Sequence, residues 1–198
     1  MNTTQLETIT KHLVQRGRGI LAADESTTSA NKRFAAVGVE ETEENRRVYR
    51  QILLTTPETA EALSGVIFYD ETFWQNTDDG KPFRELLAEA GILPGIKVDE
   101  GLIDLPGFAG EKLTRGLDLL PERMAKYRDA GAKFAKWRSV ITIGEGTPTD
   151  EAISANAFVL ARYARICQDS DIVPIVEPEV LFDGTHTAEE CEAVMARV

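Results

Sequence analysis

The side chains of this chain that could do chemistry gather at the ends of four apolar runs. The runs cover residues 19–26, 95–100, 134–138 and 172–179. Each is apolar or β-branched enough to form a buried strand. Because α/β proteins keep their active sites at the carboxyl edge of the sheet, the four runs predict one charged pocket there.

Alternation along each run brings charged side chains onto a common face. Successive side chains of a strand point to opposite faces, so residues two apart lie together. Buried amines and carboxylates are costly unless they are paired. The charged ends of the four runs are therefore expected to meet in one site and not to lie apart from one another. The pairs that share a face are Lys97 with Asp99, Lys136 with Arg138, and Glu177 with Glu179.

Strands and helices alternate along the chain and predict an α/β fold with a parallel sheet. No glycine-rich turn follows the first strand, which favours a (β/α)8 TIM barrel, here about its first five units, over an open doubly wound sheet. Trp137, Phe158 and Tyr163 are expected in the core, and residues 99–120 as a long connection without strands. The expected strands are residues 19–24, 64–70, 92–98, 132–143 and 172–180.

Composition narrows the class of partner. The chain has 198 residues, 42% of them hydrophobic, and a net charge of −11 that argues against nucleic acid or an anionic membrane as the main partner. A local basic pocket is still compatible with a small phosphorylated ligand. Cys167 and Cys191 form no redox or metal motif, and the polar amino terminus has no signal-peptide core, so a cytoplasmic location is expected.

Six motifs in order closely resemble class I fructose-bisphosphate aldolase. That family is a metal-independent and commonly homotetrameric (β/α)8 barrel. Its members reversibly cleave fructose 1,6-bisphosphate into dihydroxyacetone phosphate and glyceraldehyde 3-phosphate through a lysine Schiff base, in glycolysis and gluconeogenesis. The resemblance therefore implies a lyase that acts on a phosphorylated sugar without a cofactor. The motifs are residues 19–27, 42–47, 95–99, 134–138, 160–164 and 172–179.

The resemblance implies four catalytic residues. Cleaving a carbon–carbon bond beside a ketone leaves a carbanion, and a protonated imine accepts its electrons. By the resemblance Lys136 assists the Schiff-base lysine as a neighbouring cation. Glu177 then matches the general acid and base, with Glu179 beside it, and Asp24 matches the carboxylate at the substrate hydroxyl that is deprotonated on cleavage.

A substrate-binding set follows from the same resemblance. Lys97 matches a substrate-binding cation, and the segment that begins at Ser29 matches the region near the 6-phosphate. The two histidines, His12 and His186, have no spacing typical of zinc, and two are too few for the zinc-dependent class of aldolases. The implied substrate-binding residues are Ser26, Ser29, Lys32, Arg33, Lys97 and Arg138.

Most of these assignments have a structural alternative. Asp24 could simply cap a helix, and Lys97 could lie on a solvated rim. A basic pair after a turn, such as Lys32 and Arg33, is usually exposed to solvent. The two glutamates at the end of the last run could form structural ion pairs with the basic residues of the run before it.

The family's Schiff-base lysine lies on the sixth strand of the barrel, beyond the motifs found here. The resemblance therefore implies that residues 1–198 form a single, incomplete barrel domain that is inactive by itself. The alternative is a non-catalytic truncated barrel that acts as a binding or assembly module. A glycosidase that uses Glu177 and Glu179 fits poorly, because glycosidase carboxylates lie on opposite sides of the scissile bond.

Overall fold

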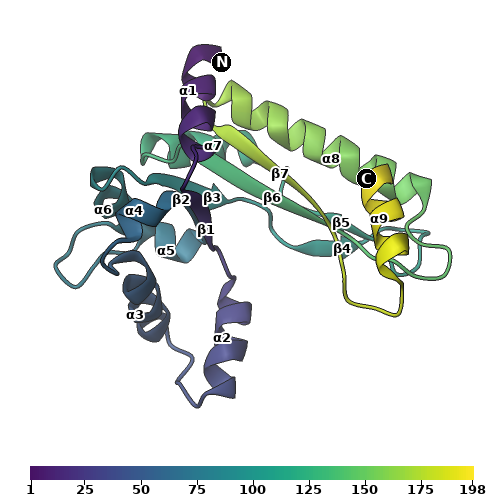
Figure 1. Ribbon diagram of the computed structural model, residues 1–198, viewed down its shortest axis with the longest axis horizontal. Helices are drawn as coiled ribbons and strands as arrows, with labels where there is room; N and C mark the ends of the chain where they lie inside the picture. Colours follow the sequence, from purple (N-terminus) through teal and green to yellow (C-terminus); the bar gives the residue numbers. More distant parts are fainter.

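A five-stranded parallel sheet organises the computed structural model, which describes all of residues 1–198 (Figure 1). Every neighbouring pair of strands is parallel, and the order in the sheet equals the order in the chain. This topology confirms the prediction that the chain forms part of a (β/α) barrel. The strands are β1 (Gly19–Ala23), β2 (Leu63–Phe68), β3 (Leu93–Lys97), β6 (Phe134–Ile141) and β7 (Val173–Val180).

Nine helices connect and cover these strands, and none of them is long and apolar enough to cross a membrane. Threonine side chains begin three of them: Thr42, Thr149 and Thr187 each accept a hydrogen bond from a backbone N–H of the first turn. The helices are α1 (Thr3–Leu13), α2 (Thr27–Ala36), α3 (Glu43–Leu54), α4 (Thr59–Ala62), α5 (Asp70–Trp74), α6 (Phe83–Glu89), α7 (Leu120–Asp129), α8 (Asp150–Asp169) and α9 (Ala188–Arg197).

The main hydrophobic core lies between one face of the sheet and helices α5, α6, α7 and α8. Trp137 of β6 and Tyr163 of α8 are fully buried in it, with ring centroids 5.4 Å apart. The expectation for Phe158 is wrong: its side chain is exposed, beside the guanidinium of Arg162. The buried residues of α8 recur every three or four positions, through Leu160 and Tyr163, and Phe158 falls outside that spacing, on the face that points away from the sheet.

A second, smaller core closes the amino-terminal end of the sheet. Helix α1 packs its Ile9 and Leu13 against Ile67, Phe134 and Val173 of three strands. Figure 1 shows α1 beside the start of β7. The end of the sheet that is opposite the predicted pocket is therefore apolar and covered.

The segment after β3 is not the bare connection that the sequence suggested. It contains an antiparallel hairpin of β4 (Leu102–Asp104) and β5 (Lys112–Thr114). Each strand has only three residues, which is too short to produce a readable alternation of apolar and polar side chains. Contacts with β6 and α8 hold β5 near the carboxyl end of the sheet.

Candidate active site

A cavity of about 770 Å³ lies at the carboxyl end of the parallel strands. It brings together eight of the ten predicted site residues, delivered by the β1–α2 turn, α2, β3, β6 and β7. The predicted convergence of the charged strand ends is therefore confirmed, although convergence alone does not assign roles. The eight are Asp24, Ser26, Ser29, Lys97, Lys136, Arg138, Glu177 and Glu179.

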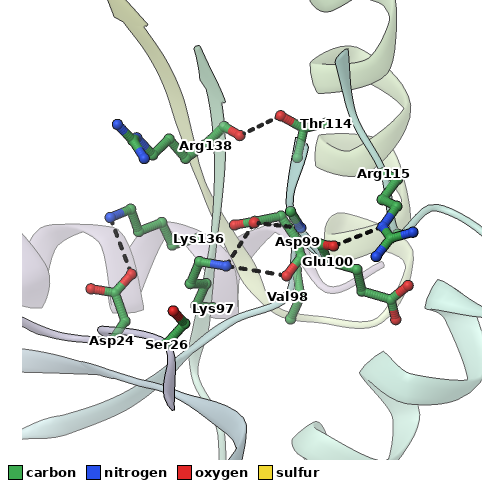
Figure 2. Close-up of polar contacts among 12 residues, drawn as sticks. Asp24, Ser26, Lys97, Val98, Asp99, Glu100, Thr114, Arg115, Lys136 and Arg138 are labelled. Carbon is green, nitrogen blue, oxygen red and sulfur yellow. Dashed lines mark hydrogen bonds and ion pairs between the residues drawn. The ribbon is translucent and has the colours of Figure 1, made fainter. Parts of the chain in front are cut away.

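Lys136 lines the cavity between two carboxylates, one from the β1–α2 turn and one from β7. Its Nζ is 3.2 Å from Oδ2 of Asp24 and 3.0 Å from Oε2 of Glu177. Figure 2 shows the contact with Asp24. Burial lowers the pKa of Lys136, but the charges of Asp24 and Glu177 outweigh burial and leave the pKa raised. The amine is thus held as an ammonium ion.

Lys97 is paired within its own strand end. Its Nζ donates to Oδ1 of Asp99 at 2.6 Å and to the Asp99 carbonyl oxygen at 3.2 Å. The Asp99 side chain is only 5% exposed, and its Oδ2 has no hydrogen-bond partner. Sequence reasoning placed Asp99 on the same face as Lys97 but gave it no role in the site. Lys97 lies opposite Lys136 in the register of β3 and β6, so two amines line one wall.

Arg138 and Glu179 form the outermost ion pair of β6 and β7. The hydrogen bond from Arg138 to Glu179 raises the pKa of the Arg138 guanidinium, so its charge is permanent. Thr114 of β5 donates from Oγ1 to the Arg138 carbonyl oxygen at 2.7 Å, as Figure 2 shows. The hairpin that sequence reasoning missed therefore supports the strand on which Arg138 and Lys136 lie.

The β1–α2 turn delivers two hydroxyl groups to the cavity. Ser26, rather than Asp24, caps α2: its Oγ accepts a hydrogen bond from the Ser29 N–H at 3.3 Å. The two serine hydroxyls are 3.1 Å apart. The cap places Ser29 on the side of α2 that faces the cavity, and leaves Asp24 free to contact Lys136.

Lys32 and Arg33 do not line the cavity. Both are exposed on α2, and Arg33 Nε lies 2.7 Å from Oε1 of Glu25. Glu25 does line the cavity, and sequence reasoning did not select it. Its signal was present, because it stands between two predicted site residues, Asp24 and Ser26.

The far wall of the cavity comes from α5 and α7, and no strand pattern pointed to it. Tyr127 donates from its hydroxyl to Oδ1 of Asp70 at 2.7 Å, and Trp74 Nε1 donates to the same oxygen at 3.0 Å. Burial and the bond to Asp70 raise the pKa of Tyr127, which keeps the hydroxyl protonated as a donor. Arg123 closes this wall with a 2.8 Å contact to Glu100.

Acid–base pairing is the common property of the cavity. Its lining contains four cations and seven carboxylates, and each of the four cations is paired with at least one of those carboxylates. No group of three or more His, Cys, Asp or Glu side chains is arranged to hold a metal ion. Side-by-side ammonium and carboxylate groups can transfer protons and stabilise charge that changes sign during a reaction.

Comparisons with known proteins agree with this arrangement. The family model described as "Glycolytic: Fructose-bisphosphate aldolase class-I" matches residues 5–198. A probable fructose-bisphosphate aldolase class 1 of Xanthomonas campestris pv. campestris is 52% identical over 194 residues, which is 98% of this chain and 58% of that protein. The cytosolic fructose-bisphosphate aldolase 5 of Arabidopsis thaliana is 54% identical over 188 residues, 95% of this chain and 52% of that protein.

A solved structure shows the same likeness in three dimensions. The fructose-bisphosphate aldolase of Plasmodium falciparum, in complex with TRAP and a small-molecule inhibitor, superposes with a TM-score of 0.95 at 48% identity. The superposition covers 98% of this chain and 56% of that one. The chain thus spans between about half and three fifths of the length of these relatives.

Proposed function

This chain belongs to the class I fructose-bisphosphate aldolase family, and from that premise we propose that the whole protein reversibly cleaves fructose 1,6-bisphosphate into dihydroxyacetone phosphate and glyceraldehyde 3-phosphate. The observation that carries the proposal is the contact of one buried amine, Lys136, with two carboxylates from separate parts of the chain, Asp24 and Glu177. Such a cluster suits a reaction in which protons move between a sugar hydroxyl, a carbinolamine and an imine.

Lys136 acts in this proposal as a cation and not as the nucleophile. An amine must be unprotonated to attack a ketone, whereas the raised pKa of Lys136 keeps it as an ammonium ion. A fixed positive charge beside a second lysine lowers the pKa of that lysine and favours its attack on the substrate. The Schiff base therefore forms on another lysine, which the family carries on the sixth strand.

The carboxylates Glu177 and Asp24 take part in different proton transfers. Glu177 is about one-third exposed and lies at the open side of Lys136, where it can protonate the departing water of a carbinolamine. Asp24 is more deeply buried and takes the proton of the substrate hydroxyl whose carbon–carbon bond breaks. Glu179 holds Arg138 in place, so that the guanidinium faces the substrate with its charge oriented.

The substrate is held by amines and hydroxyl groups around this cluster. Lys97 binds the sugar as a cation from β3, and Arg138 does so from β6. Ser26 and Ser29 present hydroxyl groups to one end of the cavity, next to the helix that carries the basic pair Lys32 and Arg33. The cavity, of about 770 Å³, has room for a polyhydroxylated chain, and its polar far wall offers hydrogen-bonding groups to such a chain.

A borohydride trapping experiment tests the proposal. The 198-residue chain and a version extended to the length of the relatives are each incubated with dihydroxyacetone phosphate, reduced with borohydride and analysed by mass spectrometry. We expect a stoichiometric adduct on a lysine beyond residue 198 in the extended protein, together with cleavage of fructose 1,6-bisphosphate. We expect neither adduct nor cleavage in the 198-residue chain, since the fixed charges of its cavity cannot replace the imine.

Two results would contradict the proposal. An adduct on Lys136 or Lys97 would mean that the nucleophile is wrongly assigned. An extended protein that forms no adduct and cleaves no bisphosphate would instead favour the non-catalytic alternative, a truncated barrel that serves as a binding or assembly module. Residues 1–198 are in either case proposed to be a single incomplete barrel domain. For the catalytic protein, we propose that the active form is a cytoplasmic homotetramer.

A further inference from the structure

One carboxylate of the cavity differs from the other six, because it has no basic partner. Asp70, the first residue of α5, lines the far wall of the cavity and forms no ion pair with any lysine or arginine of the chain. A negative charge at this wall is therefore not paired with a cation. The six carboxylates that do contact a lysine or an arginine are Asp24, Glu25, Asp99, Glu100, Glu177 and Glu179.

Two neutral donors fix the Asp70 carboxylate through only one of its oxygens. The Tyr127 hydroxyl donates to Oδ1 at 2.7 Å, and the indole Nε1 of Trp74 donates to the same atom at 3.0 Å. These two bonds use both lone pairs of Oδ1, whereas Oδ2 accepts no hydrogen bond from the chain. Because Asp70 is exposed and lines the cavity, Oδ2 is free to accept a hydrogen bond from a ligand there.

The two donor side chains are themselves held in place. The rings of Trp74 and Tyr127 stack, with their centroids 5.9 Å apart and their planes at 24°. The guanidinium of Arg84 lies 5.4 Å from the centroid of the Trp74 ring and donates to the carbonyl oxygens of Phe73 and Ala130. Asp70 is thus oriented before a ligand arrives, which lowers the entropic cost of binding.

The base on this wall, Arg123, is directed to other acceptors. It donates to Glu100 at 2.8 Å and to the carbonyl oxygens of Val98 and Gly116. A carboxylate without a cation repels a phosphate group but accepts strongly from a hydroxyl, because a hydrogen bond to a charged acceptor is about twice as strong as one between neutral groups. The wall at Asp70 therefore suits the hydroxylated part of a ligand and not its phosphate groups.

We propose that Asp70 is a specificity-determining residue, whose Oδ2 accepts a hydrogen bond from a ligand hydroxyl and so selects a hydroxylated chain over a plain hydrocarbon chain. The inference rests on the proposed function for the identity of the ligand as a sugar phosphate, and it adds a residue that recognises the hydroxyl groups. A chain of the same charge without hydroxyls would cover Oδ2 and leave it without a donor, which weakens binding.

The proposal is tested by calorimetry with two ligands and the protein extended to the length of its relatives. One ligand is an open-chain hexitol 1,6-bisphosphate, and the other is hexane-1,6-diol bisphosphate, which has the same two phosphates but no inner hydroxyls. We expect the unaltered protein to bind the hexitol more tightly. Asp70→Ala, at an exposed position, should reduce this preference about tenfold, the worth of one hydrogen bond to a charged group. Asp70→Asn, a neutral partner for the hydroxyl, should reduce it less.

Asp129→Ala is the matched control. Asp129 ends α7, the helix that carries Tyr127, and its side chain is 68% exposed beside Arg128 and does not line the cavity. The variant removes the same charge and should leave the preference for the hexitol unchanged. The proposal is overturned if the unaltered protein binds the two ligands equally, or if Asp70→Ala keeps the full preference. It is also overturned if Asp70→Ala changes both affinities by the same factor, as loss of a purely structural or repulsive charge would.

Cleavage of fructose 1,6-bisphosphate by the same proteins separates this inference from the proposed function. If the unaltered protein cleaves nothing but Asp70→Ala loses the preference for the hexitol, the hydroxyl-binding role stands and the lyase assignment fails. If the unaltered protein cleaves the bisphosphate but Asp70→Ala keeps the preference, the lyase assignment stands and the role of Asp70 is overturned.

Discussion

The two ends of the parallel sheet are made from the same strands and have opposite chemistry. At the amino-terminal end, Phe134 begins β6 in an apolar cluster beneath α1. Two residues later in the same strand, Lys136 lies among carboxylates at the carboxyl end. Two successive side chains on the same face of one strand thus have different roles: the first packs in an apolar core, and the second lines the charged cavity.

The difference teaches where the stability of this molecule resides. The amino-terminal end is close-packed: a Cβ at Gly95 would lie 2.3 Å from the Phe134 ring, and one at Gly65 would lie 2.9 Å from it. The carboxyl end is an open cavity of ion pairs, and ion pairs withdrawn from water stabilise a fold little compared with apolar side chains of equal volume. Changes at the first end should therefore affect unfolding, and changes at the second should affect binding and catalysis.

Removing the ring at the apolar end has the largest expected effect on stability. Phe134→Ala should lower the free energy of unfolding by about 3–5 kcal/mol, because a fully buried aromatic side chain leaves a cavity. Urea denaturation followed by circular dichroism measures it. Phe158→Ala, at an exposed aromatic side chain, is the control and should stay within about 0.5 kcal/mol of the unaltered chain. Equal effects of the two variants would refute the contrast between the ends.

Adding a methyl group at the same end should also destabilise, but less. Gly95→Ala places its Cβ against the Phe134 ring and should lower the free energy of unfolding by about 1–3 kcal/mol. Phe134→Leu in the same chain removes the clash, so the double variant should be more stable than the sum of the two single effects indicates. Simple additivity in urea denaturation would mean that the two residues do not compete for space.

At the charged end, stability should depend on whether the buried charges of Lys136, Asp24 and Glu177 offset one another, and not on the presence of Lys136 alone. Lys136→Met leaves Asp24 and Glu177 without their shared cation and should lower the free energy of unfolding at neutral pH by about 1–3 kcal/mol, the cost of leaving buried groups without a partner. Adding Asp24→Asn and Glu177→Gln should recover most of the loss, while removing the proposed catalytic groups. A triple variant that is no more stable than Lys136→Met would contradict this account.

The smallest expected effect is a dependence on alkaline pH. The pKa of Lys136 in the folded chain lies above 10.5, its ordinary value, because Asp24 and Glu177 outweigh burial. A raised pKa contributes stability that is fully present below 10.5 and is lost as the pH rises through the folded value. The unaltered chain should therefore lose more unfolding free energy than Lys136→Met does as the pH rises from neutral to above 10.5. If the unfolding free energies of the two proteins change in parallel with pH, titration of Lys136 does not contribute to stability.

Much of the fold and half of the site could be predicted because local rules govern them. Threonine caps and apolar spacing mark the helices, and β-branched runs mark the strands. Alternation along a strand is equally local, so the spacing of Lys136 and Arg138 is enough to place both side chains on one face. The hairpin of β4 and β5 was missed because three-residue strands are held by their partners and not by their own pattern.

The amino-acid sequence by itself determined the family, the order of the parallel strands and eight of the side chains that line the cavity, since each depends on motifs or on periodicity within a segment. Only the tertiary structure decided which charge faces which. Asp24 meets Lys136 across 112 positions of sequence, and Tyr127 meets Asp70 across 57. Arg33 turns to Glu25 although its motif pointed to a phosphate. Partners of this kind are set by the packing of whole elements and by the energy of leaving a charge unpaired, and neither can be read from spacing along the chain.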